Sequence, residues 1–568
     1  MSDDRLEILP RADGYQIRYG GRFLYSDGAP RAGAERRASG ASLPARHLVI
    51  IPSPLLWYGV ERLLERPDCP QTVLCVEADS TLAELSLRSM PKRLQQDARL
   101  VFLPHADTGS LEAVLTGIRP DAFSGCDIVS LSGGYSLNRN AYRRLEAHLR
   151  GVLRQNWQNR LSLIRLGRRW LLNAVENLPE LAESCSFAEL TFSKPVILAG
   201  AGESLEEYAS VLREWRDSIT LVAVDTALGW LAAAGLVPDL VIVLEAQLVN
   251  CEHLLGLLDH STAFGFDLSS APQLVRRVPA ARRFFFASRF AETALLDRVG
   301  EYRLIEPWIA PRGSVAVAAL DALASRLRAP VYLLGLDFSF RLGKPHARGT
   351  GSHRWYLRHT TRLSPDALYD QALTRPLLTL TDKSGRPVRS DTILAGYLDQ
   401  LRGVVASIRQ PVFDLGSSGL ELGVPRAVRP EPGPSGSELS ELGDGPPPDG
   451  RPHSNRNGDT SGVEHAGLQP VAPAAALSRR RRTGAVAALL KHEIHLLGRS
   501  VRLLEAMYRA GVVHRRRLET VLRACDYLDL DFPAPARAES ANGGTVHQLL
   551  VSARHYLRVL RNTSARCE

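Results

Sequence analysis

Residues Lys194–Gln247 read KPVILAGAGESLEEYASVLREWRDSITLVAVDTALGWLAAAGLVPDLVIVLEAQ, and this stretch decides the fold. It contains three short apolar runs, Pro195–Ala199, Thr220–Val224 and Leu240–Leu244. Helical patterns separate the runs, which predicts parallel strands connected by helices. Because open α/β sheets bind ligands at the carboxyl ends of their strands, we expect the residues that follow each run to form a site.

The first run ends in a glycine turn. Gly200 and Gly202 would let the backbone approach a ligand closely, and Ser204 with Glu207 predicts a capping box at the start of a helix. The free N–H groups at such a start, including that of Ser204, favour a phosphate. Leu205 stands where the dinucleotide fingerprint GxGxxG has its third glycine, so a tight turn without a ligand is the alternative interpretation.

The second and third runs end in acidic residues. Asp225 follows the second run at about the spacing where a nucleotide-binding fold places an acid on the ribose hydroxyls. We assign Asp225 and the adjacent Thr226 to nucleotide binding. Glu245 follows the third run at the same edge of the predicted sheet.

Composition restricts the class of protein. The chain has 568 residues, 45% of them hydrophobic and 23% charged, which is typical of a soluble protein with two or three cores. The net charge of +9 comes from arginines spread along the chain, so we interpret it as mild attraction to acidic partners and do not expect nucleic-acid binding. The seven cysteines form no CxxC pair, so neither a zinc site nor a disulfide framework is expected.

The sequence predicts a cytoplasmic protein without a transmembrane segment. The first fifteen residues are polar and do not resemble a signal peptide. The most apolar stretch, Leu221–Leu244, is long enough to span a membrane, but Asp225, Pro238 and Asp239 interrupt it.

Four parts follow from the patterns along the chain, and the fold class is α/β. Residues 1–186 resemble a degenerate Rossmann-like domain, because His47–Pro52 and Thr72–Val76 predict strands but lack the glycine turn. Residues 187–428 predict a central α/β nucleotide-binding domain with a mainly parallel sheet. Residues 429–477 are rich in Pro, Gly and Ser and predict a disordered linker. Residues 478–568 predict a C-terminal helical bundle.

Two further segments of the central part contribute candidate site residues. Gly313 and Ser314 precede an Ala/Val-rich helical pattern, so a second anion site is plausible at that helix start. Asp337 follows another strand pattern and leads into a polar loop that contains Lys344 and His346.

These segments carry a resemblance to a known family. The four stretches are KPVILAGAGESLEEY, LVAVDTALGWLAAAGLVPDLVIVLEAQ, RGSVAVAALDALASRL and LLGLDFSF with KPHA. Together they resemble the central domain of the motility accessory factor family, which are bacterial flagellin glycosyltransferases. The domain is also similar to archaeal 6-hydroxymethylpterin pyrophosphokinases (MptE-like). The resemblance covers roughly residues 187–428, and RRWLLNAVENLPEL resembles the family's lead-in to this domain.

The resemblance implies transfer of a CMP-activated nonulosonic acid to Ser or Thr of flagellin, with no cofactor or metal required. The residues that it implies for holding the nucleotide donor are Gly200, Gly202, Ser204, Asp225, Thr226, Gly313, Ser314 and Lys344. Candidates for the catalytic base are Glu245, Asp337 and His346, and Lys344 or His346 would stabilise the leaving group.

One position departs from the family's common GAGPSL. Glu203 stands where that pattern has proline, and a carboxylate beside a phosphate site is unfavourable unless it turns outward or binds a metal. This keeps an ATP-dependent pyrophosphokinase open, with Mg²⁺ held by Asp225, Asp239 or Glu245. A non-catalytic flagellar accessory protein is the third alternative.

Overall fold

A computed structural model describes most of the chain. It covers residues 6–44, 46–69, 72–105, 111, 114–115, 118, 123–247, 254, 261–291, 293–340, 344–363, 376–430, 468–470, 479–531 and 541–567. These residues form two compact units, Met1–Ser162 and Leu163–Glu568, which we describe separately. Most of the predicted linker, 429–477, lies outside the described residues. Within it, Leu468–Pro470 forms a short strand, β20, antiparallel to β9 (Leu190–Phe192).

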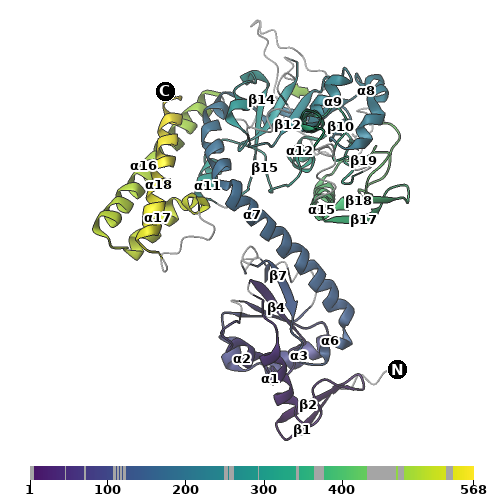
Figure 1. The fold of residues 1–568 in the computed structure, drawn as a ribbon, viewed down its shortest axis with the longest axis vertical. Coiled ribbons are helices and arrows are strands. Elements are labelled where there is room, and N and C mark those ends of the chain that lie inside the picture. Colours follow the sequence, from purple (N-terminus) through teal and green to yellow (C-terminus); the bar gives the residue numbers. More distant parts are fainter. Residues whose placement is uncertain are drawn as a thin grey trace, which may run out of the picture. The chain divides into compact units, whose positions relative to one another are not determined.

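The first unit contains two sheets (Figure 1). The smaller one is antiparallel, with β1 (Glu7–Arg11), β2 (Gly14–Tyr19) and β3 (Arg22–Phe23). The larger one is parallel in the order β6-β5-β4-β7, with β4 at His47–Pro52, β5 at Val73–Val76, β6 at Leu100–Leu103 and β7 at Gly125–Ile128. The helices include α1 (Pro30–Gly40), α2 (Val60–Leu64), α3 (Ser80–Ser89), α4 (Lys92–Gln95) and α6 (Gly134–Leu137). Alternate residues of β4 and β5 belong to two different apolar clusters, so both faces of this sheet are covered.

A nine-stranded sheet forms the centre of the second unit. Its main strands are β10 (Val196–Ala199), β11 (Thr220–Val224), β12 (Leu240–Val243), β13 (Ala263–Asp267), β14 (Arg283–Ser288), β15 (Trp308–Ile309), β16 (Val331–Leu334) and β19 (Val412–Asp414). Their order is β15-β14-β13-β12-β11-β10-β16-β19, every pairing is parallel, and β8 (Cys185–Ser186) joins β14. Most of these strands consist of buried apolar residues, because a parallel sheet is covered on both faces. The predicted mainly parallel α/β fold is confirmed.

The strand order reverses direction at β10. From β10 the chain builds the sheet outward through β11 to β15, and it then returns to add β16 and β19 on the other side of β10. The helices that carry these crossovers include α8 (Ala209–Trp215), α9 (Leu228–Ala233) and α12 (Val315–Leu323) (Figure 1). Such a reversal separates two neighbouring loops and opens a crevice at the carboxyl ends of the strands. The ends of β10 and β16 are therefore where this topology favours a ligand.

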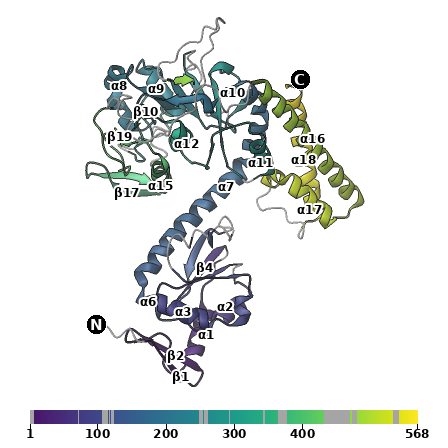
Figure 2. The same cartoon turned by 180° about the vertical axis from the view of Figure 1, so that it is seen from behind.

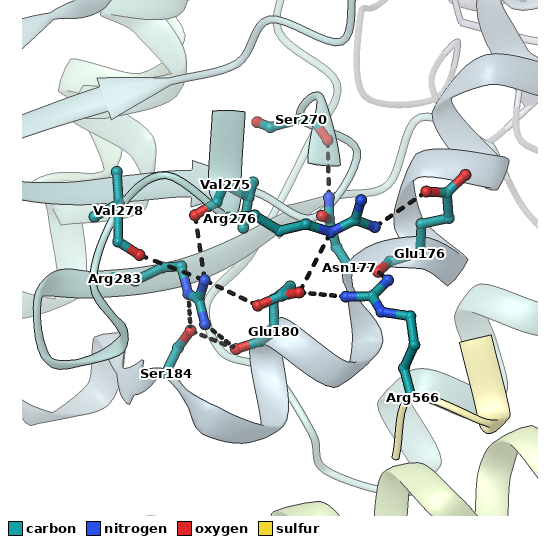
Figure 3. Close-up of polar contacts among 10 residues, drawn as sticks. All are labelled: Glu176, Asn177, Glu180, Ser184, Ser270, Val275, Arg276, Val278, Arg283 and Arg566. Atoms are coloured by element: carbon teal, nitrogen blue, oxygen red, sulfur yellow. Dashed lines mark hydrogen bonds and ion pairs between the residues drawn. The ribbon is translucent and has the colours of Figure 1, made fainter. Parts of the chain in front are cut away.

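The last turns of helix α7 (Arg139–Glu183) fasten the central sheet through polar side chains (Figure 3). The amide nitrogen of Asn177 donates to the carbonyls of Leu268 and Ser270 at 2.9 and 2.8 Å. Glu180 forms an ion pair with the buried Arg283 at 2.9 Å. Burial lowers the pKa of Arg283, and the charge of Glu180 opposes that shift. These contacts give the stretch RRWLLNAVENLPEL a structural role.

The C-terminal helices α16 (Arg479–Ala510), α17 (Arg515–Ala524) and α18 (Gly543–Ser564) pack together, with α11 (Ala294–Glu301) of the central part beside α16 (Figure 2). The predicted helical C-terminus is confirmed. Arg298 on α11 forms a two-fold ion pair with the fully buried Glu493 on α16, and its Nη2–Oε2 distance is 2.9 Å. The run Arg479–Arg482 opens α16, and Arg482 is buried and donates to the carbonyl of Ser184 at 2.6 Å. A run of arginines is usually solvated, but Arg482 lies within the packing of α16.

The most apolar stretch of the chain forms part of the central sheet and one of its connecting helices. Leu221–Leu244 is divided between β11, α9 and β12. Among the described residues, every helix is too short or too polar to cross a membrane.

Candidate functional site

A cavity of about 240 Å³ lies at the reversal point of the central sheet. Loops that follow β10, β11 and β16 form one part of its wall, and the start of α12 and the helix α15 (Thr392–Ser407) form the rest. Its lining residues are Gly200, Ala201, Gly202, Val224, Thr226, Ser314, Val315, Ala316, Gly335, Leu336, Asp337, Phe338, Ser339, Pro345, His346, Leu394 and Tyr397. The structure thus brings six of the predicted site residues, Gly200, Gly202, Thr226, Ser314, Asp337 and His346, to one cavity.

The glycine turn after β10 is required by a neighbouring loop. A Cβ atom on Gly200 would lie 2.5 Å from the carbonyl oxygen of Gly335, and one on Gly202 would lie 2.6 Å from that oxygen and from the carboxylate of Asp337. Gly335 has a φ of +69°, and a Cβ there would in turn meet the carbonyl oxygen of Gly200 at 2.6 Å. These glycines allow two strand ends to interlock. A bulky residue at Gly202 would therefore disturb the fold as well as the cavity.

Ser204 does not have the role that the sequence suggested. Its N–H donates to Asp337 at 2.8 Å and its hydroxyl donates to the same carboxylate at 2.5 Å. The segment Glu203–Tyr208 is a 3₁₀ helix that lacks the predicted capping box, and Glu207 accepts a hydrogen bond from Ser417 instead. Asp337 thus supplies the anion at this helix start. The N–H of Ser204 is already used, which removes it as the predicted phosphate donor.

Glu203, the residue that departs from the family pattern, forms an ion pair with Lys344. The ammonium group of Lys344 lies 3.0 Å from the carboxylate of Glu203 and 3.3 Å from that of Glu206. Lys344 therefore neutralises the glutamate that departs from the family pattern, and it is not among the residues that line the cavity. Its predicted part in holding the donor or the leaving group is not supported by this position.

Asp225 is buried beside the cavity without an ion-pair partner among the described residues. Its Oδ1 accepts hydrogen bonds from the N–H and the hydroxyl of Thr226 at 2.7 and 3.0 Å. Burial raises the pKa of Asp225 to about 6, the charge of Glu245 adds to the shift, and the hydrogen bonds from Thr226 oppose it. Asp225 does not line the cavity itself, although Val224 and Thr226 on either side of it do. An unpaired, buried carboxylate next to a cavity is a candidate for ligand binding.

We expect this carboxylate to cost stability at neutral pH. The folded-state pKa of Asp225 is above its ordinary value. The stability that Asp225 contributes to the folded state is therefore fully present below about pH 4 and is lost as the pH rises through about 6. The free energy of unfolding of the wild type should therefore fall relative to Asp225→Asn by on the order of 3 kcal/mol between about pH 4 and pH 7. Urea unfolding across this pH range measures the difference. The exposed Asp217→Asn is the control, and parallel curves for Asp225→Asn and the wild type would contradict the expectation.

The start of α12 presents unused backbone donors to the cavity. Ser314 is the N-cap residue, its side chain caps nothing, and Val315 and Ala316 line the cavity. Within the described part of the chain, the N–H groups of Val315 and Ala316 donate to no protein acceptor. A helix start of this kind favours an anionic group of a ligand. The start of α12, the second anion site that the sequence suggested, is therefore a better candidate for an anionic ligand group than the glycine turn.

The three base candidates separate by position. His346 lines the cavity, and the hydrogen bond from the N–H of Ala347 to the carbonyl of Ala201, 2.9 Å, holds its loop against the glycine turn. Asp337 also lines the cavity, but both of its oxygens accept hydrogen bonds from Ser204. Glu245 is outside the lining and accepts from the N–H of Gln247 at 2.7 Å. His346 is the candidate with the most direct access.

The carboxylates proposed for a metal under the kinase alternative do not all lie together. Asp225 and Glu245 follow β11 and β12, whereas Asp239 precedes β12 and is at the opposite edge of the sheet. Asp239 accepts from the N–H of Leu221 at 2.8 Å and forms an ion pair with Arg216 at 2.7 Å. In the described part of the chain, no group of three or more His, Cys, Asp or Glu side chains is arranged to hold a metal ion.

Two groups near the cavity were missed at the sequence level. Lys383 and Asp414 form a buried ion pair at 2.6 Å, and the positive charge of Lys383 also favours the charged form of Asp337. Tyr397 and Leu394 extend from α15 into the cavity wall. Lys383 lies in the turn between the antiparallel strands β17 (Leu377–Thr381) and β18 (Pro387–Asp391), where a lysine is normally exposed, so nothing local indicated its burial.

Comparisons with known proteins agree with this architecture. The family model "6-hydroxymethylpterin diphosphokinase MptE-like" matches residues 172–343. A Treponema pallidum (strain Nichols) protein, described only as uncharacterized, is 30% identical over 427 residues, which cover 73% of each chain. A second uncharacterized protein of that strain is 32% identical over 89 residues, which cover 15% of this chain and 42% of the relative. The solved structure of a MAf glycosyltransferase from Magnetospirillum magneticum AMB-1 is similar, with a TM-score of 0.52, 15% identity, and coverage of 99% of this chain and 90% of the other; this likeness concerns the fold.

Proposed function

The chain belongs to one family with the Treponema pallidum protein and carries an MptE-like domain, and from this premise we propose that it is a glycosyltransferase. The proposed donor is a CMP-activated nonulosonic acid, and the proposed acceptor is a Ser or Thr hydroxyl of flagellin, modified in the cytoplasm. The fold shared with a MAf glycosyltransferase supports this class. The observation that carries the proposal is the cavity at the reversal point, which both His346 and the residues with unused N–H groups at the start of α12 line.

In the proposed reaction, the N–H groups at the start of α12 hold the phosphate of the donor. Thr226, which lines the cavity, borders the ribose, and the adjacent Asp225 holds Thr226 in place by accepting hydrogen bonds from its N–H and its hydroxyl. His346 takes the proton of the acceptor hydroxyl, whose oxygen attacks the anomeric carbon of the sugar. The bond from that carbon to the phosphate oxygen breaks, and CMP leaves with the bonding electron pair. The dipole of α12 stabilises the charge that develops on the phosphate.

The match to the MptE-like model supports a second candidate, pyrophosphoryl transfer from ATP to a hydroxymethylpterin. Such a reaction normally uses Mg²⁺ to hold the phosphates. Asp225 and Glu245, which follow adjacent strands, are the residues that would hold the ion. The two candidates differ in nucleotide and in their need for metal, which makes them separable by binding experiments.

The variant Val315→Pro tests the position of the phosphate. Val315 is the first residue of α12, where proline removes one N–H but is compatible with the helix, and Ser314 before it already has the extended conformation that proline requires. Because a hydrogen bond to a charged group contributes about 1.5–3 kcal/mol, we expect the Kd for CMP to rise about tenfold or more. Calorimetric titrations with CMP and with ATP plus Mg²⁺ measure it. Unchanged CMP affinity in Val315→Pro would place the phosphate elsewhere, and binding of ATP but not of CMP would favour the kinase.

A further inference from the structure

Tyr397 occupies a special position beside the phosphate site. Its ring borders the cavity, and the wall at this point is completed by Leu394, one turn earlier on α15. A Cβ atom on Gly313, the residue before the N-cap of α12, would lie 2.1 Å from Cε1 of this ring. Any residue other than glycine at position 313 would therefore displace the ring. Glycine at position 313 therefore leaves room for an aromatic side chain next to the unused N–H groups of α12.

Several contacts fix the part of α15 that carries Tyr397. The N–H of Gly313 donates to the side-chain oxygen of Gln400 at 3.2 Å, so the chain before α12 is tied to the same face of α15. Asp391 caps α15 by accepting from the N–H groups of Ile393 and Leu394 at 2.9 and 2.7 Å. Leu394, Tyr397 and Gln400 are spaced three residues apart and thus share one face of the helix. The aromatic wall is therefore preorganised by both helices.

We propose that Tyr397 is the platform on which the pyrimidine base of the nucleotide donor stacks, and that Gly313 is required to admit it; this rests on the proposed CMP-dependent function. A nucleotide offers an anionic phosphate and a flat base a short distance apart, and the start of α12 and Tyr397 offer the matching pair of surfaces. The cavity of about 240 Å³ is smaller than the roughly 300–1,000 Å³ of typical ligand pockets. In this proposal the cavity takes the nucleotide portion of the donor, and the sugar lies outside it.

The test separates the base from the rest of the nucleotide. Calorimetry on the full chain would compare CMP with ribose 5-phosphate, which lacks the base, for the wild type and for Tyr397→Leu, Tyr397→Phe and Tyr397→Trp. Stacking predicts that Tyr397→Leu raises the Kd for CMP about tenfold and leaves that for ribose 5-phosphate unchanged, because a stacked base contributes through the aromatic face alone. The Phe and Trp variants keep that face and should bind CMP within about twofold of the wild type.

The requirement for Gly313 has its own test. Gly313→Ala should weaken CMP binding about as much as Tyr397→Leu does, and combining the two should add little, since both remove the same contact. The inference is overturned if Tyr397→Leu binds CMP as the wild type does, or if it loses CMP and ribose 5-phosphate equally. Loss of CMP affinity in Val315→Pro alone would then still support the proposed function. Failure of the wild type to bind CMP would overturn the proposed function itself.

Discussion

Replacing His346 by alanine is expected to lower the rate of sugar transfer by about 10²- to 10⁴-fold, the usual contribution of a positioned general base. Of the three base candidates, His346 and Asp337 line the cavity, whereas Glu245 does not. The carboxylate of Asp337 already accepts hydrogen bonds from Ser204, so His346 is the best placed of the three. The affinity for CMP should change little, because the phosphate and base contact other residues in this account. Transfer kinetics with a saturating donor measure the effect.

The neighbouring histidine provides a matched control for this prediction. His353 lies on α13 (Gly351–His359), outside the cavity lining, where it accepts a hydrogen bond from the N–H of Gly349 at 3.3 Å. His353→Ala should therefore transfer sugar at close to the wild-type rate. Equal rates for His346→Ala and the wild type would remove His346 from the chemistry and return attention to Asp337.

Replacing Glu493 by alanine is expected to destabilise the second unit by about 3–5 kcal/mol, because Arg298 would keep its charge in a buried position without a partner. Burial raises the pKa of Glu493, which means that keeping this carboxylate charged already costs the native protein some stability. The double variant Arg298→Met/Glu493→Leu removes both charges and should recover most of the loss. Urea unfolding of the full chain measures all three proteins.

An exposed ion pair in the same helices is the control for Glu493. Glu505 on α16 and Arg554 on α18 form an ion pair at 2.7 Å near the surface, where solvent screens the charges, so Glu505→Ala should cost much less stability than Glu493→Ala. If Glu493→Ala is no more costly than Glu505→Ala, the buried pair does not fasten α16 to α11. The expected contrast would show that the C-terminal helices are part of the stability of the central unit.

The parallel sheet could be predicted from local patterns. The runs that became β10, β11 and β12 are short, apolar and followed by Gly200, Asp225 and Glu245, so the strand positions and the edge where the cavity lies followed directly. The helical C-terminus could be predicted as well, because apolar residues such as Leu490, Leu497 and Leu504 recur at helical spacing and form the buried face of α16.

Long-range partners could not be predicted in the same way. Ser204 and Asp337 are 133 residues apart, and nothing near either residue shows that the carboxylate replaces a bound phosphate at the helix start. The close packing of Gly200 against Gly335 could not be predicted either. In the sequence, a glycine turn that packs against a neighbouring loop cannot be distinguished from one that binds a ligand. A buried ion pair could have been expected from one position. Glu493 lies between Leu490 and Leu497 on the apolar face of α16, and a charge buried there needs a partner.

The most direct measurement of the central claim is the mass of flagellin after incubation with the purified protein and a CMP-activated nonulosonic acid. We expect a gain of one or more sugar masses on Ser or Thr residues, with release of CMP and only a modest loss of rate in EDTA, because α12 stabilises the leaving phosphate. Unchanged flagellin, together with EDTA-sensitive release of AMP from ATP in the presence of a hydroxymethylpterin, would contradict the account and assign the protein to pyrophosphoryl transfer.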